Sequence, residues 1–221
     1  MQRPGGASDA QAVGTHSKKK SQRAAEQDRP ELKARREDWR EELAEIDPAR
    51  LVFLDESGAA TTMARRHGRA PSGVRVDGAV PHGYWKVVTL TAAMRIGGVG
   101  ACLTFDGATD AACFETYVEK CLIPTLKPGD IVIMDNLSSH KTAEVARLIG
   151  SVGAEVRYLP PYSPDLNPIE LMFSKLKTFL RKVAKRTVDG VIEAIGDGLR
   201  TVTPQDIQGW FRHDGYRLTQ T

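Results

Sequence analysis

The pattern of hydrophobic and polar positions divides the chain into a polar beginning and a long series of regular elements. Residues 1–30 show no hydrophobic periodicity and contain three consecutive lysines at positions 18–20. This composition predicts a flexible basic arm. From Glu31 to Ile46, hydrophobic residues recur at the spacing of one helical face, and Pro48 follows. A helix is therefore expected there, ending before the proline.

Short hydrophobic runs and helical periodicity alternate over the rest of the chain. The runs predict five strands, over residues 51–55, 87–96, 99–105, 131–135 and 155–159. Helices are expected over residues 111–123, 142–149, 168–185 and 188–202, and another begins at residue 203. The stretch 58–83 is rich in Gly, Arg and Pro and is expected to be irregular or a twisted hairpin. This order predicts an α/β fold, a mixed sheet flanked by helices.

Composition excludes several classes of protein. The chain has 221 residues and a formal net charge of +3. It has no apolar run near the ~18 residues that a membrane helix needs, and no apolar core of a secretory signal. Its three cysteines, Cys102, Cys113 and Cys121, form no CxxC pair. They fit a reducing cytosol without disulfides or a zinc finger.

Three acidic residues are candidates for chemistry. Asp55 and Asp135 each follow a hydrophobic run, and Glu170 lies near the start of a predicted helix. Strand ends on one sheet edge bring such carboxylates together, and their repulsion is relieved by a divalent cation. Oxygen ligands without a Cys or His cluster favour Mg²⁺ or Mn²⁺ over zinc.

Each acid also has an ordinary structural interpretation. Asp55 could belong to the acidic strand of a nucleotide triphosphatase, although the chain has no GxxxxGK[ST] loop. Asp135 could begin a turn with Asn136, and Ser138 or Ser139 could cap the next helix. Asn167 and Glu170 have the spacing of a capping box. From the residues alone, the sequence indicates a metal-dependent α/β enzyme.

Four segments resemble the catalytic domain of DDE transposases, most of all the mariner-like transposases of bacterial insertion sequences. They are LVFLDESGA, PHGYWK, PGDIVIMDNLSSHK and YLPPYSPDLNPIELMFSKLK, and 34 residues separate Asp135 from Glu170 as in that group. The resemblance implies a ribonuclease-H-like five-stranded sheet and a catalytic, metal-binding triad of Asp55, Asp135 and Glu170. It also implies two Mg²⁺ (or Mn²⁺) ions, DNA cleavage and strand transfer at element ends, and insertion at a TA target.

The same resemblance suggests supporting roles for three residues. Asn136 is expected to orient a ligand and His140 to lie near the phosphate, with a local hydrogen bond at a helix start as the alternative for His140. Asn167 is expected to act first as a helix cap.

Cations on the helix after Glu170 indicate a nucleic-acid surface, because no acidic residue lies between Leu171 and Arg186. An Arg cluster between the first two strands is a weaker candidate. The predicted DNA contacts are Arg65, Arg66, Arg69, Lys141, Lys175, Lys177, Arg181, Lys182 and Lys185.

The resemblance also predicts the domain organisation. We expect a flexible arm or linker remnant over residues 1–30, a linker helix over 31–48, the catalytic domain over 49–186, and C-terminal helices of the same domain over 187–221. Full-length relatives carry helix-turn-helix modules upstream, so this chain is expected to be a truncated copy or the downstream product of a split element.

The expected partners are double-stranded DNA, a second copy of the chain and a DNA-binding product of an upstream frame, in the bacterial cytoplasm at the nucleoid, with no membrane. Two other functions stay open. One is a non-catalytic fragment that binds DNA or dimerises. The other is a ribonuclease-H-like nuclease or resolvase.

Overall fold

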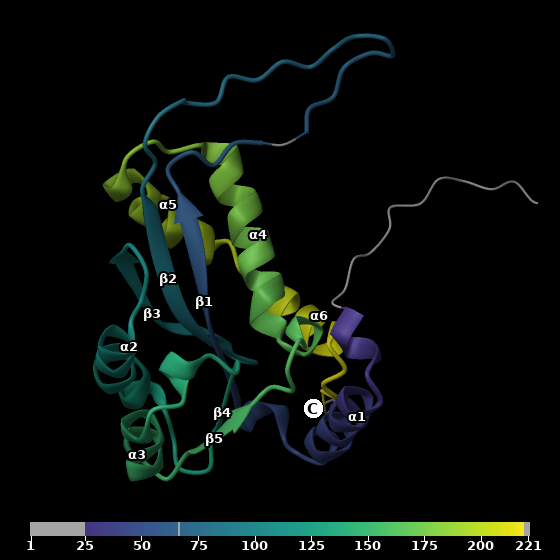
Figure 1. Ribbon diagram of the computed structural model, residues 1–221, viewed down its shortest axis with the longest axis vertical. Coiled ribbons are helices and arrows are strands. Elements are labelled where there is room, and N and C mark those ends of the chain that lie inside the picture. Colours follow the sequence, from purple (N-terminus) through teal and green to yellow (C-terminus); the bar gives the residue numbers. More distant parts are fainter. Residues whose placement is uncertain (1–24, 66, 219–221) are drawn as a thin grey trace, which may run out of the picture.

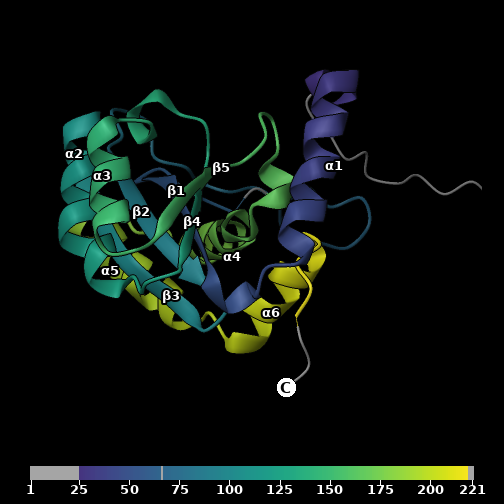
Figure 2. The ribbon, with the colours of Figure 1, turned by 90° about the horizontal axis from the view of Figure 1, so that it is seen from below.

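The computed structural model describes residues 25–65 and 67–218, which form one five-stranded sheet with helices on both faces (Figures 1 and 2). The strands are β1 (Leu51–Ala60), β2 (Val87–Arg95), β3 (Gly98–Asp106), β4 (Ile131–Met134) and β5 (Glu155–Tyr158). The helices are α1 (Pro30–Ala44), α2 (Ala111–Tyr117), α3 (Ala143–Ser151), α4 (Pro168–Val183), α5 (Val188–Arg200) and α6 (Pro204–His213). The predicted α/β fold with a mixed sheet is confirmed.

The predicted N-terminal arm falls mostly outside the described residues, which begin at residue 25. Its described end, Ala25–Asp28, forms a 3-10 turn before α1. The predicted helix over residues 111–123 is shorter than expected, because the α-helical part ends at Tyr117. A π-helical turn (Val118–Leu122) and a 3-10 turn (Ile123–Thr125) complete it. Pro124 has no backbone N–H and cannot continue a regular helix.

Strand β1 lies in the centre of the sheet, whose order is β3-β2-β1-β4-β5. It pairs antiparallel with β2 and parallel with β4, and β4 pairs parallel with β5. The prediction that this strand ends at Asp55 is wrong. Pairing with β4 stops at Phe53, but pairing with β2 continues to Ala60. Asp55 therefore lies within β1, just past the point where β4 turns away.

Two hydrophobic layers cover the two faces of the sheet. Phe53 packs with α4, α5 and α6, whereas its neighbours Val52 and Leu54 pack with α2 and α3. Figure 2 shows these two groups of helices on opposite sides of the strands. Side chains two apart on a strand share a face, so Asp55 follows Phe53 toward α4. This alternation positions the acid over the start of that helix.

Helix α1 lies beside α6, away from α2 and α3 (Figures 1 and 2). Its Trp39 and Leu43 are buried in the same hydrophobic cluster as Phe53. The Trp39 indole Nε1 also donates to the Tyr216 hydroxyl at 3.4 Å. The predicted linker helix is thus packed against the C-terminal part of the chain.

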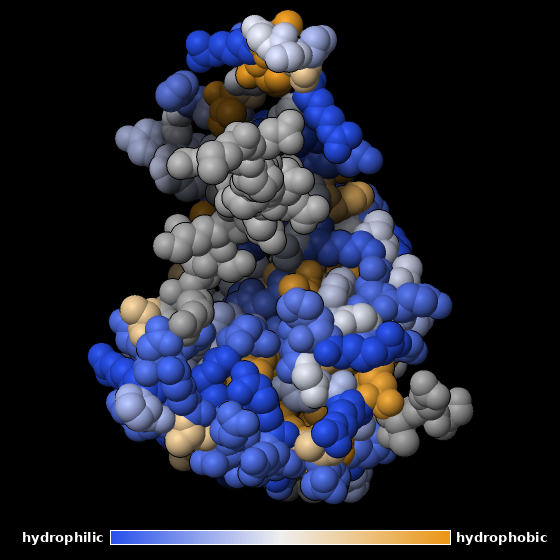
Figure 3. Space-filling model, turned by 90° about the vertical axis from the view of Figure 1, so that its right-hand side faces the viewer, coloured by the Kyte–Doolittle hydropathy of each residue, from blue (hydrophilic) through white to orange (hydrophobic). Residues whose placement is uncertain are grey.

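The segment between β1 and β2 projects from the body of the protein (Figure 1). Its described residues from 63 onwards contain no strand or helix, which agrees with the irregular alternative for 58–83, although residues 58–60 belong to β1. Figure 3 shows hydrophobic atoms at its tip above a largely hydrophilic face. Its most exposed large hydrophobic side chains are Val74, Val76, Val80, Tyr84 and Trp85. In the part of the chain that the structure describes, no helix has the length and hydrophobicity to cross a membrane.

Candidate active site

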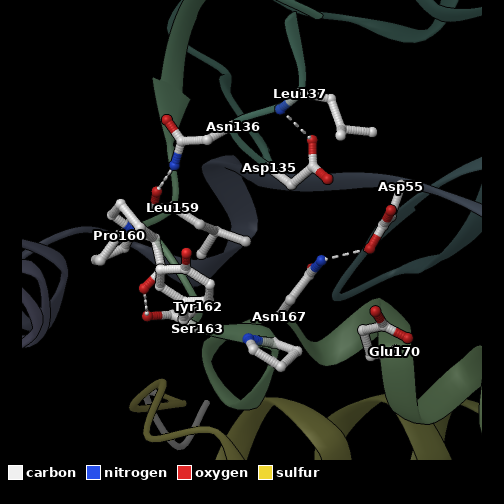
Figure 4. Close-up of a pocket in the computed structure, with 12 residues that line it drawn as sticks. Asp55, Asp135, Asn136, Leu137, Leu159, Pro160, Tyr162, Ser163, Asn167 and Glu170 are labelled. Atoms are coloured by element: carbon white, nitrogen blue, oxygen red, sulfur yellow. Dashed lines mark hydrogen bonds between the residues drawn. The ribbon is translucent and has the colours of Figure 1, made fainter. Parts of the chain in front are cut away.

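The three predicted acids line one pocket of about 540 Å³, which lies between the central strands and the start of α4 (Figure 4). Asp55 comes from the middle of β1, Asp135 directly follows β4, and Glu170 lies in the first turn of α4. The other lining residues are Asn136, Leu137, Leu159, Pro160, Pro161, Tyr162, Ser163, Pro164 and Asn167. The topology therefore brings together side chains that are up to 115 positions apart (170 − 55).

Asp55 is the most enclosed of the three acids, with 9 % of its surface exposed. Its Oδ1 accepts from the backbone N–H of Glu56 at 2.7 Å, and its Oδ2 accepts from Asn167 Nδ2 at 2.8 Å. Burial raises the pKa of Asp55 to about 7, and repulsion from Glu170 and Asp135 contributes. Burial and neighbouring carboxylates thus disfavour the charged form of Asp55, and a bound cation would restore it.

Asp135 is held in place by groups that follow it in the chain. Its Oδ1 accepts from the Leu137 N–H at 3.0 Å and lies 2.7 Å from His140 Nδ1. Burial alone would raise the pKa of Asp135, but these hydrogen bonds outweigh burial and leave the pKa below its ordinary value. The predicted turn after Asp135 is therefore present, and it orients the carboxylate toward the pocket (Figure 4).

His140 is fully buried and stacks on Phe114 with 4.1 Å between ring centroids. Its Nδ1 contacts Asp135, which is the local hydrogen bond that the sequence left as an alternative. The next helix, α3, is capped by Thr142 through the Val145 N–H. The expectation of a cap at Ser138 or Ser139 is wrong, because these two residues belong to the turn Ser138–His140.

The predicted capping box at the start of α4 is not formed. Asn167 is the N-cap residue but makes no side-chain cap hydrogen bond, because its amide is directed to Asp55. Its Oδ1 is buried and has no partner among the described residues. Glu170 is thus not held by a reciprocal cap bond. Partial burial raises the pKa of Glu170, Lys177 opposes this, and Asp135 adds to it.

Asn136 connects the ends of two neighbouring strands. Its Nδ2 donates to the carbonyl of Leu159, just after β5 (Figure 4). This hydrogen bond stabilises the pocket wall. The expected role of Asn136 in orienting a ligand stays a prediction.

The donor set matches a hard divalent cation in kind, since three carboxylates line one pocket. The amide oxygen of Asn167, a residue that also lines the pocket, is buried and has no hydrogen-bond partner among the described residues. The side chains do not yet close around an ion. Over residues 25–65 and 67–218, no three Asp, Glu, His or Cys side chains are close enough to form a metal cluster. The site is therefore chemically suited to Mg²⁺ or Mn²⁺ but open in this conformation.

The predicted DNA-contact residues fall into three places. On α4, Lys182 is exposed near the C-terminal end and Lys177 lies near Glu170. The exposed Lys185 lies just beyond the helix, which ends at Val183 and not at residue 185 as predicted. On the segment between β1 and β2, Arg65 and Arg69 are exposed, and Arg66 lies outside the described residues. Next to the pocket, the exposed Lys141 places its ammonium 5.2 Å from the Tyr158 ring centroid. The α4 contacts also include the half-buried Arg181.

Lys175 differs from the other α4 cations. Its Nζ contacts the Asp206 carboxylate at 2.5 Å and the Thr201 carbonyl at 2.9 Å. Asp206 in turn forms a capping box with Thr203 at the start of α6. Lys175 therefore joins α4 to α6, and we withdraw it from the candidate DNA contacts.

The sequence predicted a stiff loop over residues 160–164, before α4, but not the contacts that hold it. Tyr162 has a positive φ of 57°, and Ser163 is buried. The Arg36 side chain from α1 reaches this loop. One sequence signal for it exists, since Arg36 falls on the hydrophobic face of its helix, four residues after Leu32.

A family model described as DDE superfamily endonuclease matches residues 50–191. The comparison with curated proteins gives no match. Among solved structures, the Mos1 transposase paired-end complex with left transposon end has a TM-score of 0.73 at 18 % identity, over 92 % of this chain and 64 % of that chain. This chain therefore spans slightly less than two thirds of that relative's length.

Two further Mos1 structures show the same fold. The mariner Mos1 paired-end complex with Mn has a TM-score of 0.69 at 17 % identity, over 94 % of this chain and 69 % of that chain. The catalytic domain of Mos1 mariner transposase has a TM-score of 0.56 at 16 % identity, over 86 % of this chain and 94 % of that chain. At these identities the likeness shows a shared ribonuclease-H-like fold.

Proposed function

Because the chain belongs to the DDE superfamily of endonucleases, we propose that it is the catalytic domain of a DNA transposase. It would cleave phosphodiester bonds at the ends of an insertion sequence and transfer the freed strand into a TA target. The observation that carries this proposal is the single pocket shared by Asp55, Asp135 and Glu170. The fold shared with the Mos1 complexes supports it.

The three acids are the proposed ligands of two Mg²⁺ or Mn²⁺ ions, with Asp55 and Asp135 sharing one ion and Glu170 holding the other. Such ions, when bound, activate a water or 3′-hydroxyl and stabilise the leaving oxygen of a phosphodiester. The raised pKa of Asp55 supports this assignment, because burial and neighbouring carboxylates disfavour its charge until a cation is present. Mn is named in one of the Mos1 structures.

The chain's own residues would position the ligands and the substrate. Asn167 holds the Asp55 carboxylate, and His140 holds that of Asp135. In this proposal His140 positions the metal ligand Asp135. A direct contact between His140 and the phosphate stays a prediction. Two fixed carboxylates reduce the reorganisation needed when ions and DNA bind.

Double-stranded DNA is the proposed substrate. Phosphates would be contacted by cations on and just after α4, by Lys141 beside the pocket and by Arg65 and Arg69 on the projecting segment. The first group comprises the half-buried Lys177 and Arg181 and the exposed Lys182 and Lys185. A homodimer is proposed because two element ends must be processed together, and the paired-end Mos1 complexes support this arrangement. A DNA-binding product of an upstream frame stays a prediction.

Nicking of supercoiled plasmid by the purified chain in Mn²⁺ tests the proposal. Wild-type protein is expected to nick only with the metal, and Asp135→Asn is expected to abolish nicking. Asp47→Asn is the matched control. It makes the same chemical change at an exposed N-cap position, where asparagine caps as well as aspartate.

Metal-independent nicking, or nicking that survives Asp135→Asn, would contradict the proposed site. A wild-type chain that binds DNA without nicking would support the non-catalytic fragment, and a preference for RNA hybrids or branched DNA would support the nuclease.

A further inference from the structure

The buried face of α1 carries one cation. Its buried residues are Leu32, Arg36, Trp39 and Leu43, at the spacing of a single helical stripe. The Arg36 side chain is only 9 % exposed. A guanidinium is costly to bury unless its N–H groups are paired, so the partners of Arg36 indicate what this helix face is arranged to hold.

All the hydrogen-bond partners of Arg36 among the described residues lie in the loop that precedes α4. Nη1 donates to Ser163 Oγ at 2.6 Å and to Asp165 Oδ1 at 3.0 Å, and Nη2 donates to Asp165 Oδ2 at 2.5 Å. The contact with Asp165 is a two-pronged guanidinium–carboxylate pair, which fixes direction as well as distance. Burial would raise the pKa of Asp165, but the bonds from Arg36 outweigh it and lower that pKa.

Two more contacts hold the same loop from the same side. Gln27, in the turn before α1, donates its Nε2 to the Tyr162 carbonyl at 2.5 Å. The Tyr216 hydroxyl, which accepts from Trp39, donates to the Leu166 carbonyl at 2.6 Å. Contacts from α1, its preceding turn and the C-terminal tail therefore hold residues 162–166 in place.

The loop contains a backbone conformation that needs such support. Tyr162 has φ of 57° in the left-handed region, although it carries a side chain. Conformations of this kind persist only where the surrounding structure fixes them, and they gather at functional sites. The loop leads directly into Asn167, whose amide holds Asp55, and into Glu170.

We propose that Arg36 is a positioning residue for the active site. It fixes the loop 162–166 so that Asn167 and Glu170 meet Asp55 at the pocket, without itself contacting the substrate. This inference rests on the proposed function, because the loop matters through the metal ligands that it places. Helix α1, which precedes the sheet in sequence, thereby helps to set the geometry of the catalytic site.

Hydrogen exchange of the full chain tests the mechanical part of the inference. The amides of Leu166, Asn167 and Glu170 are protected by hydrogen bonds within the loop and the first turn of α4. In Arg36→Ala these amides are expected to exchange faster than in wild type. Asp165→Asn changes the half-exposed partner of the same pair and is expected to speed exchange at the same amides. It therefore tests the inference even if the Arg36 variant fails to fold.

A matched control separates positioning from general stabilisation. Arg95→Ala removes another partly buried ion pair, with Asp130 at 2.7 Å, whose partners lie outside the loop. It is expected to lower the melting temperature without faster exchange at Asn167 and Glu170. Arg36→Lys keeps the charge but loses the two-pronged geometry, so it is expected to behave like Arg36→Ala.

Mn²⁺ affinity, measured by the free-Mn²⁺ signal in electron paramagnetic resonance, tests the link to the site. Arg36→Ala is expected to weaken binding about tenfold, the lower end for residues that orient metal ligands. Faster exchange confined to α1, or unchanged Mn²⁺ affinity beside a wild type that binds, would overturn the inference. If wild type binds no Mn²⁺, the proposed function fails, and the exchange result still decides whether Arg36 fixes the loop.

Discussion

Asn167 Nδ2 donates a 2.8 Å hydrogen bond to Oδ2 of Asp55, across 112 positions of sequence. This contact joins the start of α4 to the middle of β1, at the pocket where the acids gather. It uses an amide that the local sequence pattern assigned to a helix cap. The side chain therefore serves the carboxylate in place of the helix terminus.

Asn167→Ala is expected to weaken Mn²⁺ binding about tenfold and to reduce metal-dependent nicking with it. Without the amide, the buried Asp55 carboxylate loses its side-chain hydrogen-bond donor and is no longer fixed in position to bind the ion. Electron paramagnetic resonance of free Mn²⁺ measures the affinity. Asn136→Ala is the comparison, because its amide bonds the Leu159 carbonyl and no acid. Equal weakening by the two variants would contradict the role of Asn167.

His140→Phe is expected to preserve the fold and to impair the site. Phenylalanine keeps an aromatic ring beside Phe114, but it is larger than the fully buried imidazole, so the unfolding free energy is expected to fall by about 1–3 kcal/mol. The bond to Asp135 is lost, and burial then raises the pKa of Asp135. Mn²⁺ binding is expected to shift to higher pH, as measured by titration at pH 5 to 8 alongside denaturant unfolding. A variant with wild-type Mn²⁺ affinity at every pH would show that His140 serves packing alone.

The lysines on and just after α4 are expected to separate into two groups. Replacing Lys182 and Lys185 by Gln should flatten the salt dependence of duplex binding by ~0.9 for each lost phosphate contact. Lys175→Gln should leave that slope unchanged and reduce stability by about 0.5 kcal/mol, because Lys175 is paired with Asp206. Fluorescence anisotropy at several salt concentrations measures the slopes. A flatter slope for Lys175→Gln would return that residue to the DNA surface.

Asp214 is expected to make stability depend on pH. Burial raises its pKa to about 6, repulsion from Asp165 adds to this, and His213 opposes it. A carboxyl whose pKa is higher in the folded state favours folding at low pH, and this contribution is lost as pH rises from about 4 to about 6. Asp214→Asn removes the buried charge, so its melting temperature relative to wild type should increase between pH 4 and pH 7. A constant difference across this range would contradict the assignment.

The order and type of the regular elements followed from local patterns. Hydrophobic runs predicted the five strands, and helical periodicity predicted α1, α4 and α5 closely, because burial on one face imposes a period on the sequence. The exceptions depend on neighbours. β1 continues past Asp55 because β2 pairs with it as far as Ala60. No pattern within residues 51–60 carries that information.

Residue types and positions made the three acids candidates, and the resemblance to DDE transposases joined them as a triad. The structure places them in one pocket. What the supporting residues do was decided only by the tertiary structure. Asn167 bonds Asp55 and Lys175 bonds Asp206, where local spacing indicated a cap and a phosphate contact. A polar side chain takes the partner that leaves the fewest buried groups unpaired, and that partner is often distant in sequence. Periodicity records which face of an element is buried, but only the packed fold determines which partners that face meets.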